Sequence, residues 1–199
     1  MFPLLHLLIL IFPSLQIDKS KTIIIYFSRP GENYNVGKVD KGNTEMIVDY
    51  LRELSNIRIY KIIPEQEYPE NYEETLKVVQ NEQSSNARPV IKNPLIDISN
   101  YDNILLGYPI WYGHIPNILI NLLESLDLKG KVIYPFNTHE GSETGNSISE
   151  IKKYAPNAIV KKGFPLSGTD ARNAESHGII KKWFHEIITS KEENENDFL

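Results

Sequence analysis

Cysteine is absent from this chain of 199 residues. The absence excludes thiol catalysis, disulfide redox chemistry, iron–sulfur clusters and cysteine-ligated zinc. The five histidines include no pair at the helical spacing of a metalloprotease zinc site, so no metal ligand is expected. Any redox chemistry of this protein must therefore come from a bound cofactor.

The chain also lacks an excess of positive charge, because its 26 Asp and Glu residues outnumber its 21 Lys and Arg residues and leave a net charge of -5. A nucleic-acid backbone requires a basic face, so no nucleic acid is expected as a partner. Three motifs are missing as well: the Gly-Lys-Ser/Thr phosphate loop, a Gly-x-Gly-x-x-Gly fingerprint after the first apolar run, and Gly-x-Ser-x-Gly. These absences argue against triphosphate-binding loops, dinucleotide-binding loops and serine hydrolases.

No apolar run is long and unbroken enough to indicate a membrane span, because Pro13 and Ser14 interrupt the apolar residues 1–17. That run also lacks the preceding positive charge and the following small residues of a secretory signal. We expect an apolar leader or extension at residues 1–20, one domain at 21–190 and an acidic tail at 191–199. The protein is expected to be cytoplasmic, without stable membrane insertion of the domain, and export is the alternative if residues 1–17 act as a signal peptide. The oligomeric state is left open.

What the chain does contain is an alternation of short β-branched runs with amphipathic stretches, beginning at Thr22. This alternation is typical of βαβ units, in which helices connect parallel strands. Five strands are expected, at residues 22–27, 57–63, 103–107, 131–137 and 158–161. Apolar side chains at helical spacing predict helices near 47–54, 71–82, 119–126 and 180–187, and Ser147 with Glu150 predicts a capping box that opens a shorter helix. The pattern predicts an α/β fold, a doubly wound five-stranded parallel sheet with helices on both faces.

In open parallel sheets, ligands bind beyond the carboxyl ends of the strands, so the loops at those ends are the candidates. Loop one, residues 28–44, carries glycines and small hydroxyl and amide side chains, and it leads into a helix. Backbone N–H groups at a helix start bind phosphate without lysine or metal. The alternative is that Thr44 only caps the helix and that the glycines only form turns.

Loop two, residues 107–116, carries apolar and aromatic side chains where a strand end normally presents polar ones. A flat apolar ligand lying against them explains this composition, with Trp111 as the stacking platform. The alternative is that Trp111 and Tyr112 cap the edge of the core.

Loop three, residues 137–145, offers hydroxyl and backbone N–H groups, notably from Thr138 and Gly141. His139 is the one candidate catalytic residue, because an imidazole beside a ligand can relay a proton or stabilise negative charge. Simple surface exposure of a loop histidine is the alternative.

Four segments resemble the flavodoxin-like family of bacterial FMN proteins: Ile24-Ile-Tyr-Phe-Ser-Arg29, Gly42-Asn-Thr-Glu45, Gly107-Tyr-Pro-Ile-Trp-Tyr-Gly113 and Pro135-Phe-Asn-Thr-His-Glu-Gly-Ser142. The similarity runs from about Lys21 to Ile188. In that family the first loop holds the FMN phosphate, the second stacks on the isoalloxazine ring and the third contacts its pyrimidine end. Residues 30–41 are inserted in loop one, so the chain resembles a branch with a long phosphate loop.

The resemblance implies FMN as cofactor and assigns its ligands by position. The implied phosphate ligands are Ser28, Arg29, Asn43 and Thr44. The implied ring contacts are Pro109, Ile110, Trp111, Tyr112 and Gly113, and the implied contacts at the pyrimidine edge are Thr138, His139, Gly141 and Ser142. Within the insertion, Tyr34 is expected to fold over the ligand.

Three functions stay open at this point. The first is a flavodoxin-type redox protein that carries electrons between a reductase and an acceptor, with a redox partner protein. The second is an NAD(P)H-dependent FMN quinone reductase, which the His-Glu-Gly-Ser segment of loop three resembles and which uses a small quinone-like acceptor. The third is a cofactor-free binding module with the same fold. Whether the protein is an enzyme depends on this choice.

Overall fold

A computed structural model describes residues 17–189 of the chain. Residues 1–16 of the expected leader lie outside the described residues. The expected acidic tail at 191–199 also lies outside them. Six parallel strands form the central sheet, in the order β4 (Arg58–Lys61), β1 (Thr22–Tyr26), β5 (Asn103–Pro109), β6 (Val132–His139) and β7 (Ile159–Val160), with β8 (Phe164–Ser167) also paired with β6. This order is that of a doubly wound sheet and confirms the predicted fold class.

The prediction of five strands was wrong by one. The expected strand at 158–161 contains only β7, which pairs with the start of β6, and β8 then pairs with the later part of the same strand. Pro165 hid β8 in the sequence, because a proline argues against a strand. Here β8 lies at the edge of the sheet, where the missing N–H of a proline is tolerated.

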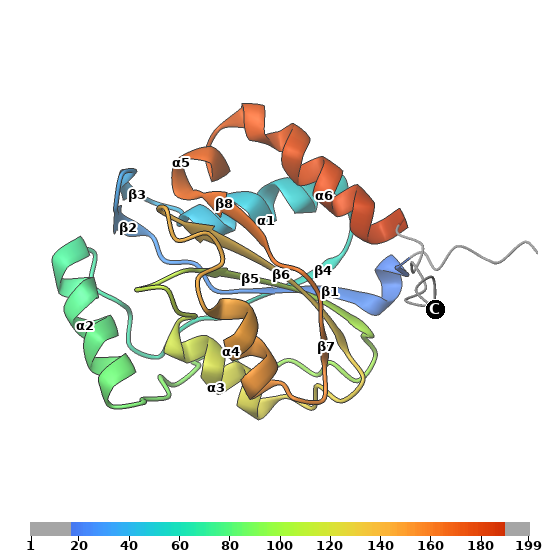
Figure 1. The fold of residues 1–199 in the computed structure, drawn as a ribbon, viewed down its shortest axis with the longest axis horizontal. Helices are drawn as coiled ribbons and strands as arrows, with labels where there is room; N and C mark the ends of the chain where they lie inside the picture. The colour runs from blue at the N-terminus through green and yellow to red at the C-terminus, as the bar shows by residue number, and fades with distance from the viewer. Residues whose placement is uncertain (1–16, 190–199) are drawn as a thin grey trace, which may run out of the picture.

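Helices cover both faces of the sheet, as expected (Figure 1). One face carries α1 (Asn43–Leu54), α5 (Gly168–Ala171) and α6 (His177–Thr189), and the other carries α3 (Asn117–Ser125) and α4 (Ser147–Tyr154). Short 3-10 turns lie at Lys19–Lys21 and Ala174–Ser176. Strand β1 is buried throughout, because Ile24 packs into the core beneath α1 and α6 while Ile23 and Ile25 pack into the core beneath α3 and α4.

Two elements stand beyond the carboxyl ends of the strands. The inserted residues 30–41 fold into an antiparallel hairpin of β2 (Gly31–Asn33) and β3 (Gly37–Val39). Helix α2 (Tyr72–Ser84) lies beside this hairpin at the same end of the sheet (Figure 1). The hairpin and α2 therefore add walls to the region where the strand-end loops meet.

The capping box predicted at Ser147 and Glu150 does not form. Asn146 precedes α4, and the Ser147 hydroxyl donates instead to the carbonyl oxygen of Thr144 at 2.6 Å. The Glu150 carboxylate bonds to His114 Nδ1 at 2.7 Å and accepts the backbone N–H of Ile115 at 3.0 Å. A long-range contact has thus replaced the local one, and it anchors loop two to α4. No helix among residues 17–189 has the length and apolar character needed to cross a membrane.

Candidate functional site

A cavity of about 310 Å³ lies at the carboxyl end of the sheet, where loops one, two and three converge. Its volume falls within the range of small-molecule sites, roughly 300–1,000 Å³. All but one of the residues implied as FMN ligands line it: Ser28, Arg29, Asn43, Thr44, Pro109, Ile110, Trp111, Tyr112, Gly113, Thr138, His139 and Ser142. The fold thus brings these residues together, and their contact with a ligand stays a prediction.

The start of α1 forms one end of the cavity. Ser28 Oγ accepts the backbone N–H of Glu45 at 3.1 Å and so caps the helix from the preceding strand end. A Cβ on Gly42 would overlap both Ser28 Oγ and the carbonyl oxygen of Arg29, so only glycine lets strand and helix meet here. The N–H groups of Asn43 and Thr44, in the first turn, have no partner within the helix. This arrangement suits an anion.

Arg29 lies in the floor of this end of the cavity. Its Nε donates to Thr75 Oγ1 at 3.3 Å, and its two terminal nitrogens donate to the carbonyl oxygens of Pro30, Glu32 and Glu70. These bonds occupy all five N–H donors of the guanidinium. No N–H group of Arg29 is therefore left to form the expected direct hydrogen bond to a phosphate. The side chain instead ties the hairpin to the segment before α2.

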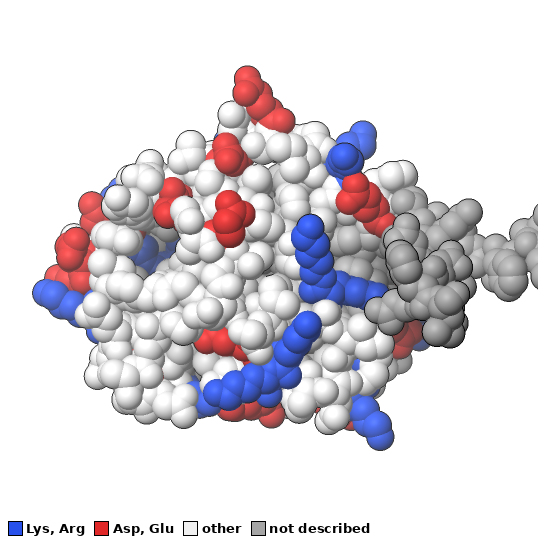
Figure 2. All heavy atoms as spheres, viewed as in Figure 1, with Lys and Arg blue, Asp and Glu red and all other residues white. Residues whose placement is uncertain are grey.

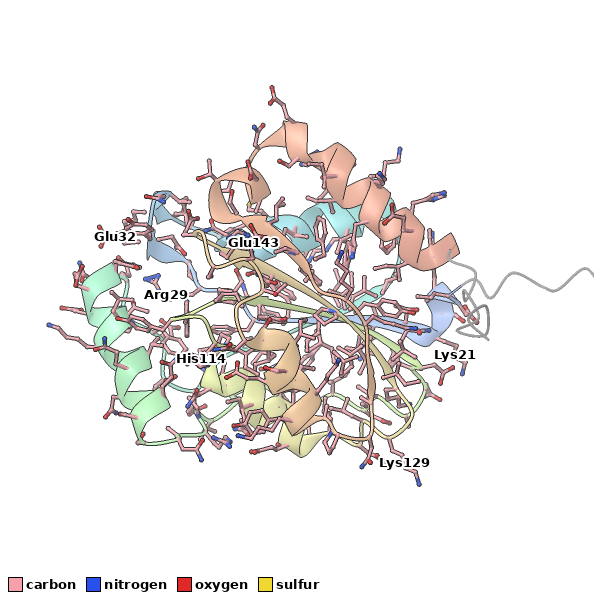
Figure 3. All side chains as sticks on the ribbon, viewed as in Figure 1. Lys21, Arg29, Glu32, His114, Lys129 and Glu143 are labelled. Carbon is pink, nitrogen blue, oxygen red and sulfur yellow. The ribbon has the colours of Figure 1, made fainter. Side chains whose placement is uncertain are left out.

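Arg29 nevertheless brings positive charge to the cavity. Arg29 is 8% exposed, and its burial lowers the pKa of the guanidinium. No carboxylate within residues 17–189 forms an ion pair with it. Figure 2 shows acidic side chains on the surface around the hairpin and α2, with a recessed positive group between them, and Figure 3 labels Arg29 in that position.

A buried pair of hydroxyl groups joins loop one to β6. Thr44 Oγ1 and Thr138 Oγ1 are 2.8 Å apart, although 94 residues separate them in sequence. Thr44 is 1% exposed and Thr138 is 4% exposed. The carbonyl oxygen of Thr138 also accepts the backbone N–H of Ile110 at 2.8 Å, so Thr138 holds loop two as well. The three loops therefore form one connected structure.

Loop two makes a tight turn at Trp111–His114. The two end residues exchange backbone hydrogen bonds of 3.0 Å, and Tyr112 and Gly113 both have positive φ, at 51° and 79°. Two positive φ angles are typical of a two-residue hairpin turn. Gly145 packs directly on the Gly113 carbonyl and leaves no space for a Cβ, so loop three holds this turn in place.

The two aromatic rings of the turn have different environments. Trp111 packs edge-on against Phe27 at 5.5 Å and Tyr68 at 4.9 Å between ring centroids, which supports the alternative that it caps the edge of the core. Tyr112 is 47% exposed, and its hydroxyl accepts a hydrogen bond from Gln80 of α2. Both residues line the cavity, and Tyr112 offers the freer ring.

His139 is held in loop three by a backbone contact. Its Nδ1 accepts the N–H of Gly141 at 3.0 Å, so the neutral imidazole carries its proton on Nε2. The side chain is 8% exposed, which makes the alternative of simple surface exposure wrong. Gly141, the implied ligand that does not line the cavity, thus uses its N–H to orient His139. Its φ of 100° is a conformation that suits glycine.

A second wall of the cavity includes residues that the sequence analysis did not assign to a ligand, with the exception of Tyr34. This wall consists of Glu32, Asn33, Tyr34, Tyr72, Thr75, Leu76, Val79 and Glu140. Tyr34 stacks on Tyr72 with 5.8 Å between ring centroids, so the hairpin and α2 meet in this wall. Glu140 accepts hydrogen bonds from Asn35 in the hairpin and from the Gly168 backbone. The helical periodicity of α2 cannot reveal that the helix stands beside the cavity.

Comparisons with known proteins agree on one fold. The family model described as Flavodoxin matches residues 21–187. A candidate flavoprotein of Bacteroides eggerthii DSM 20697 is 30% identical, with a TM-score of 0.65 over 86% of this chain and 99% of its own. A candidate flavoprotein of Bacteroides uniformis ATCC 8492 is 26% identical, with a TM-score of 0.67 over 83% and 98% of the two chains. A flavoprotein in complex with FMN from Lactobacillus acidophilus NCFM is 21% identical, with a TM-score of 0.60 over 83% and 99%. A comparison with curated proteins found no match.

Proposed function

The chain belongs to the flavodoxin family, and from this premise we propose that it binds FMN and carries electrons between a reductase and an acceptor. Bound FMN supplies one- and two-electron transfer, and the protein tunes its potential. The observation that carries the proposal is one cavity with the start of helix α1 at one end and apolar rings at the other. FMN has a phosphate and an aromatic ring system at its two ends.

The helix-start end of the cavity fits a phosphate. Asn43 and Thr44 offer backbone N–H groups there, and Ser28 lies against the same helix turn. A buried guanidinium without a carboxylate partner, such as that of Arg29, is costly unless an anion approaches it. We therefore assign Ser28, Asn43 and Thr44 as phosphate ligands and Arg29 as the charge behind them.

The loop-two end of the cavity fits the isoalloxazine ring. Pro109, Ile110, Trp111, Tyr112 and Gly113 supply an apolar and aromatic surface. This surface is held on both sides. Glu150 of α4 accepts the backbone N–H of Ile115, and from α2 Gln83 donates to the Trp111 carbonyl oxygen and Gln80 to the Tyr112 hydroxyl. A fixed surface orients a flat ring without reorganisation on binding.

His139 is assigned to the pyrimidine edge together with Thr138 and Ser142. Because the N–H of Gly141 occupies Nδ1, the proton on Nε2 is the one that His139 can donate. A donor at that edge stabilises negative charge on the ring, so His139 raises the reduction potential.

A second function, an NAD(P)H-dependent reductase of small quinones, is favoured by a separate observation. Tyr34 and Tyr112 both line the cavity, yet they are 55% and 47% exposed. Exposed rings beside a cavity offer a stacking surface to a second flat molecule. In that case the acceptor is a small quinone-like molecule instead of a redox partner protein.

The test is a titration of the purified chain with FMN, followed by quenching of flavin fluorescence, and then potentiometry of the complex. Tight binding supports the proposal, and a chain that neither quenches nor retains flavin refutes it in favour of a cofactor-free module. Steady oxidation of NAD(P)H with a quinone, lost in Trp111→Ala, favours the reductase over the carrier. We place the protein in the cytoplasm, and recovery of the chain from an exported fraction contradicts that placement.

A further inference from the structure

A fourth strand-end loop lies behind the phosphate end of the cavity. Strand β8 ends at Ser167, which pairs with His139 at the end of β6, and residues 167–172 comprise the four-residue helix α5 with its two capping residues. We call this segment the β8–α5 loop. It supplies no residue to the cavity lining, but it contacts two residues that do, Asn43 and Glu140.

Arg172, at the end of this loop, reaches loop one across the sequence. One terminal guanidinium nitrogen donates to the carbonyl oxygen of Lys41 at 2.9 Å and to Asn43 Oδ1 at 3.1 Å. Partial burial lowers the pKa of this guanidinium. Within the described part of the chain no carboxylate forms an ion pair with it. Its positive charge is therefore available to the phosphate end of the site.

The contact with Arg172 decides which way the Asn43 amide faces. A guanidinium only donates hydrogen bonds, so the amide oxygen must be the atom that faces it. The amide nitrogen is then left as a donor, and no acceptor within residues 17–189 bonds to it. Asn43 is 8% exposed and lines the cavity. The free donor therefore belongs to a buried side chain at the end of the cavity that suits an anion.

Gly168 provides the space in which this amide lies. A Cβ at position 168 would overlap Asn43 Nδ2 and would come within 2.5 Å of Glu140 Oε1. The Gly168 N–H donates to the same Glu140 oxygen at 3.0 Å, which fixes the backbone of the loop. Within the β8–α5 loop, Arg172 thus holds the amide oxygen of Asn43, and Gly168 leaves room for the amide nitrogen.

We propose that the β8–α5 loop makes the site selective for the phosphorylated flavin: Arg172 and Gly168 are positioning residues that present the Asn43 amide nitrogen to the phosphate of FMN. This inference rests on the proposed function, and it adds a loop that the three ligand-binding loops do not include. The phosphate is the only part of FMN that riboflavin lacks, so the two ligands separate this role from a general effect on the fold.

The experiment compares the Kd values of FMN and riboflavin, measured by fluorescence quenching, for wild type and Arg172→Gln. We expect the Kd of FMN to rise about tenfold, which equals about 1.4 kcal/mol, while that of riboflavin changes less than about twofold. Arg172→Lys keeps a charged donor and should recover part of the loss. Arg52→Gln is the matched control, because it removes the same charge from an exposed side chain that pairs with Asp49.

A second variant reaches the same amide without changing charge. Gly168→Ala should push the Asn43 side chain away and produce the same selective loss of FMN affinity. Gly178→Ala is its control, because a Cβ there meets nothing within 4 Å. The phosphate loses its second proton near pH 6, so the preference of wild type for FMN should increase from pH 5 to pH 7.5. That increase should be smaller in Arg172→Gln.

The outcomes separate the two proposals. A wild-type chain that binds neither flavin refutes the proposed function. A wild-type chain that prefers FMN, with Arg172→Gln and Gly168→Ala showing the same preference, overturns only the role of the β8–α5 loop. Equal losses for FMN and riboflavin in these variants also overturn it. The double variant Arg172→Gln with Asn43→Ala gives one more test. If its loss of FMN affinity equals the sum of the two single losses, the role of the loop is also overturned, since a positioning residue acts through the group that it positions.

Discussion

The hydroxyl pair of Thr44 and Thr138 provides a direct test of the claim that loops one and three form one structure. Thr138→Val removes one hydroxyl and leaves the other beside a methyl group, in a place where Thr44 is 1% exposed. A buried hydroxyl without a partner costs about 1–3 kcal/mol. We therefore expect Thr138→Val to lower the free energy of unfolding by about 1–2 kcal/mol, and Thr44→Val to lower it by a similar amount.

The double variant Thr44→Val with Thr138→Val should lose no more than either single variant. Replacing both partners with apolar groups of the same shape leaves no unpaired hydroxyl, so the replacement is nearly neutral. The interaction energy in the double-mutant cycle should then reach about 1 kcal/mol or more. Urea unfolding of the flavin-free chain measures it, and each kcal/mol should move the Tm by about 2–4 °C in a domain of this size.

Thr169→Val is the control for this cycle, because Thr169 is exposed and the change should stay within about 0.5 kcal/mol. Two results refute the reasoning. One is a double variant whose loss equals the sum of the single losses, and the other is a pair of single variants as stable as Thr169→Val.

Three further predictions concern the cavity and its support. Gly42→Ala should abolish FMN binding and lower the free energy of unfolding by more than about 2 kcal/mol, since its Cβ overlaps the Arg29 carbonyl oxygen; normal flavin quenching by this variant would contradict the close contact. Burial raises the pKa of Glu82 above its ordinary 4.5, so its ionisation destabilises the fold as the pH rises. Glu82→Gln keeps an acceptor for the Tyr68 hydroxyl, so its stability relative to wild type should increase between pH 4 and pH 7. Urea unfolding measures this difference, and a stability difference that is the same at every pH argues against the ionisation of Glu82 as its cause. His139→Ala should lower the FMN reduction potential by roughly 30–60 mV, the equivalent of one hydrogen bond to a charged group; an unchanged potential across neutral pH removes His139 from that role.

The architecture and three of the loops at the cavity can be predicted from the sequence. Alternating β-branched and amphipathic segments are a local signal, because a strand buried on both faces needs a run like Ile23–Ile25 whatever lies around it. Once the strands are known, the carboxyl-end rule places their loops at one edge of the sheet. Ser28, Trp111 and Thr138 were found in this way, far apart in sequence and together in the cavity.

The contacts that hold those loops, and the other elements around the cavity, depend on how the whole chain packs. Pro165 concealed an edge strand, and the local capping signal of Glu150 was overridden by its contact with loop two. Arg29 was expected at the phosphate, yet its donors bind backbone carbonyls of the hairpin and of the segment before α2. The contact of Arg172 with Lys41 spans 131 residues, and no pattern within a strand or helix encodes such a pairing. Periodicity reports which side of an element is buried, whereas the partner that buries it is chosen only when the whole chain packs.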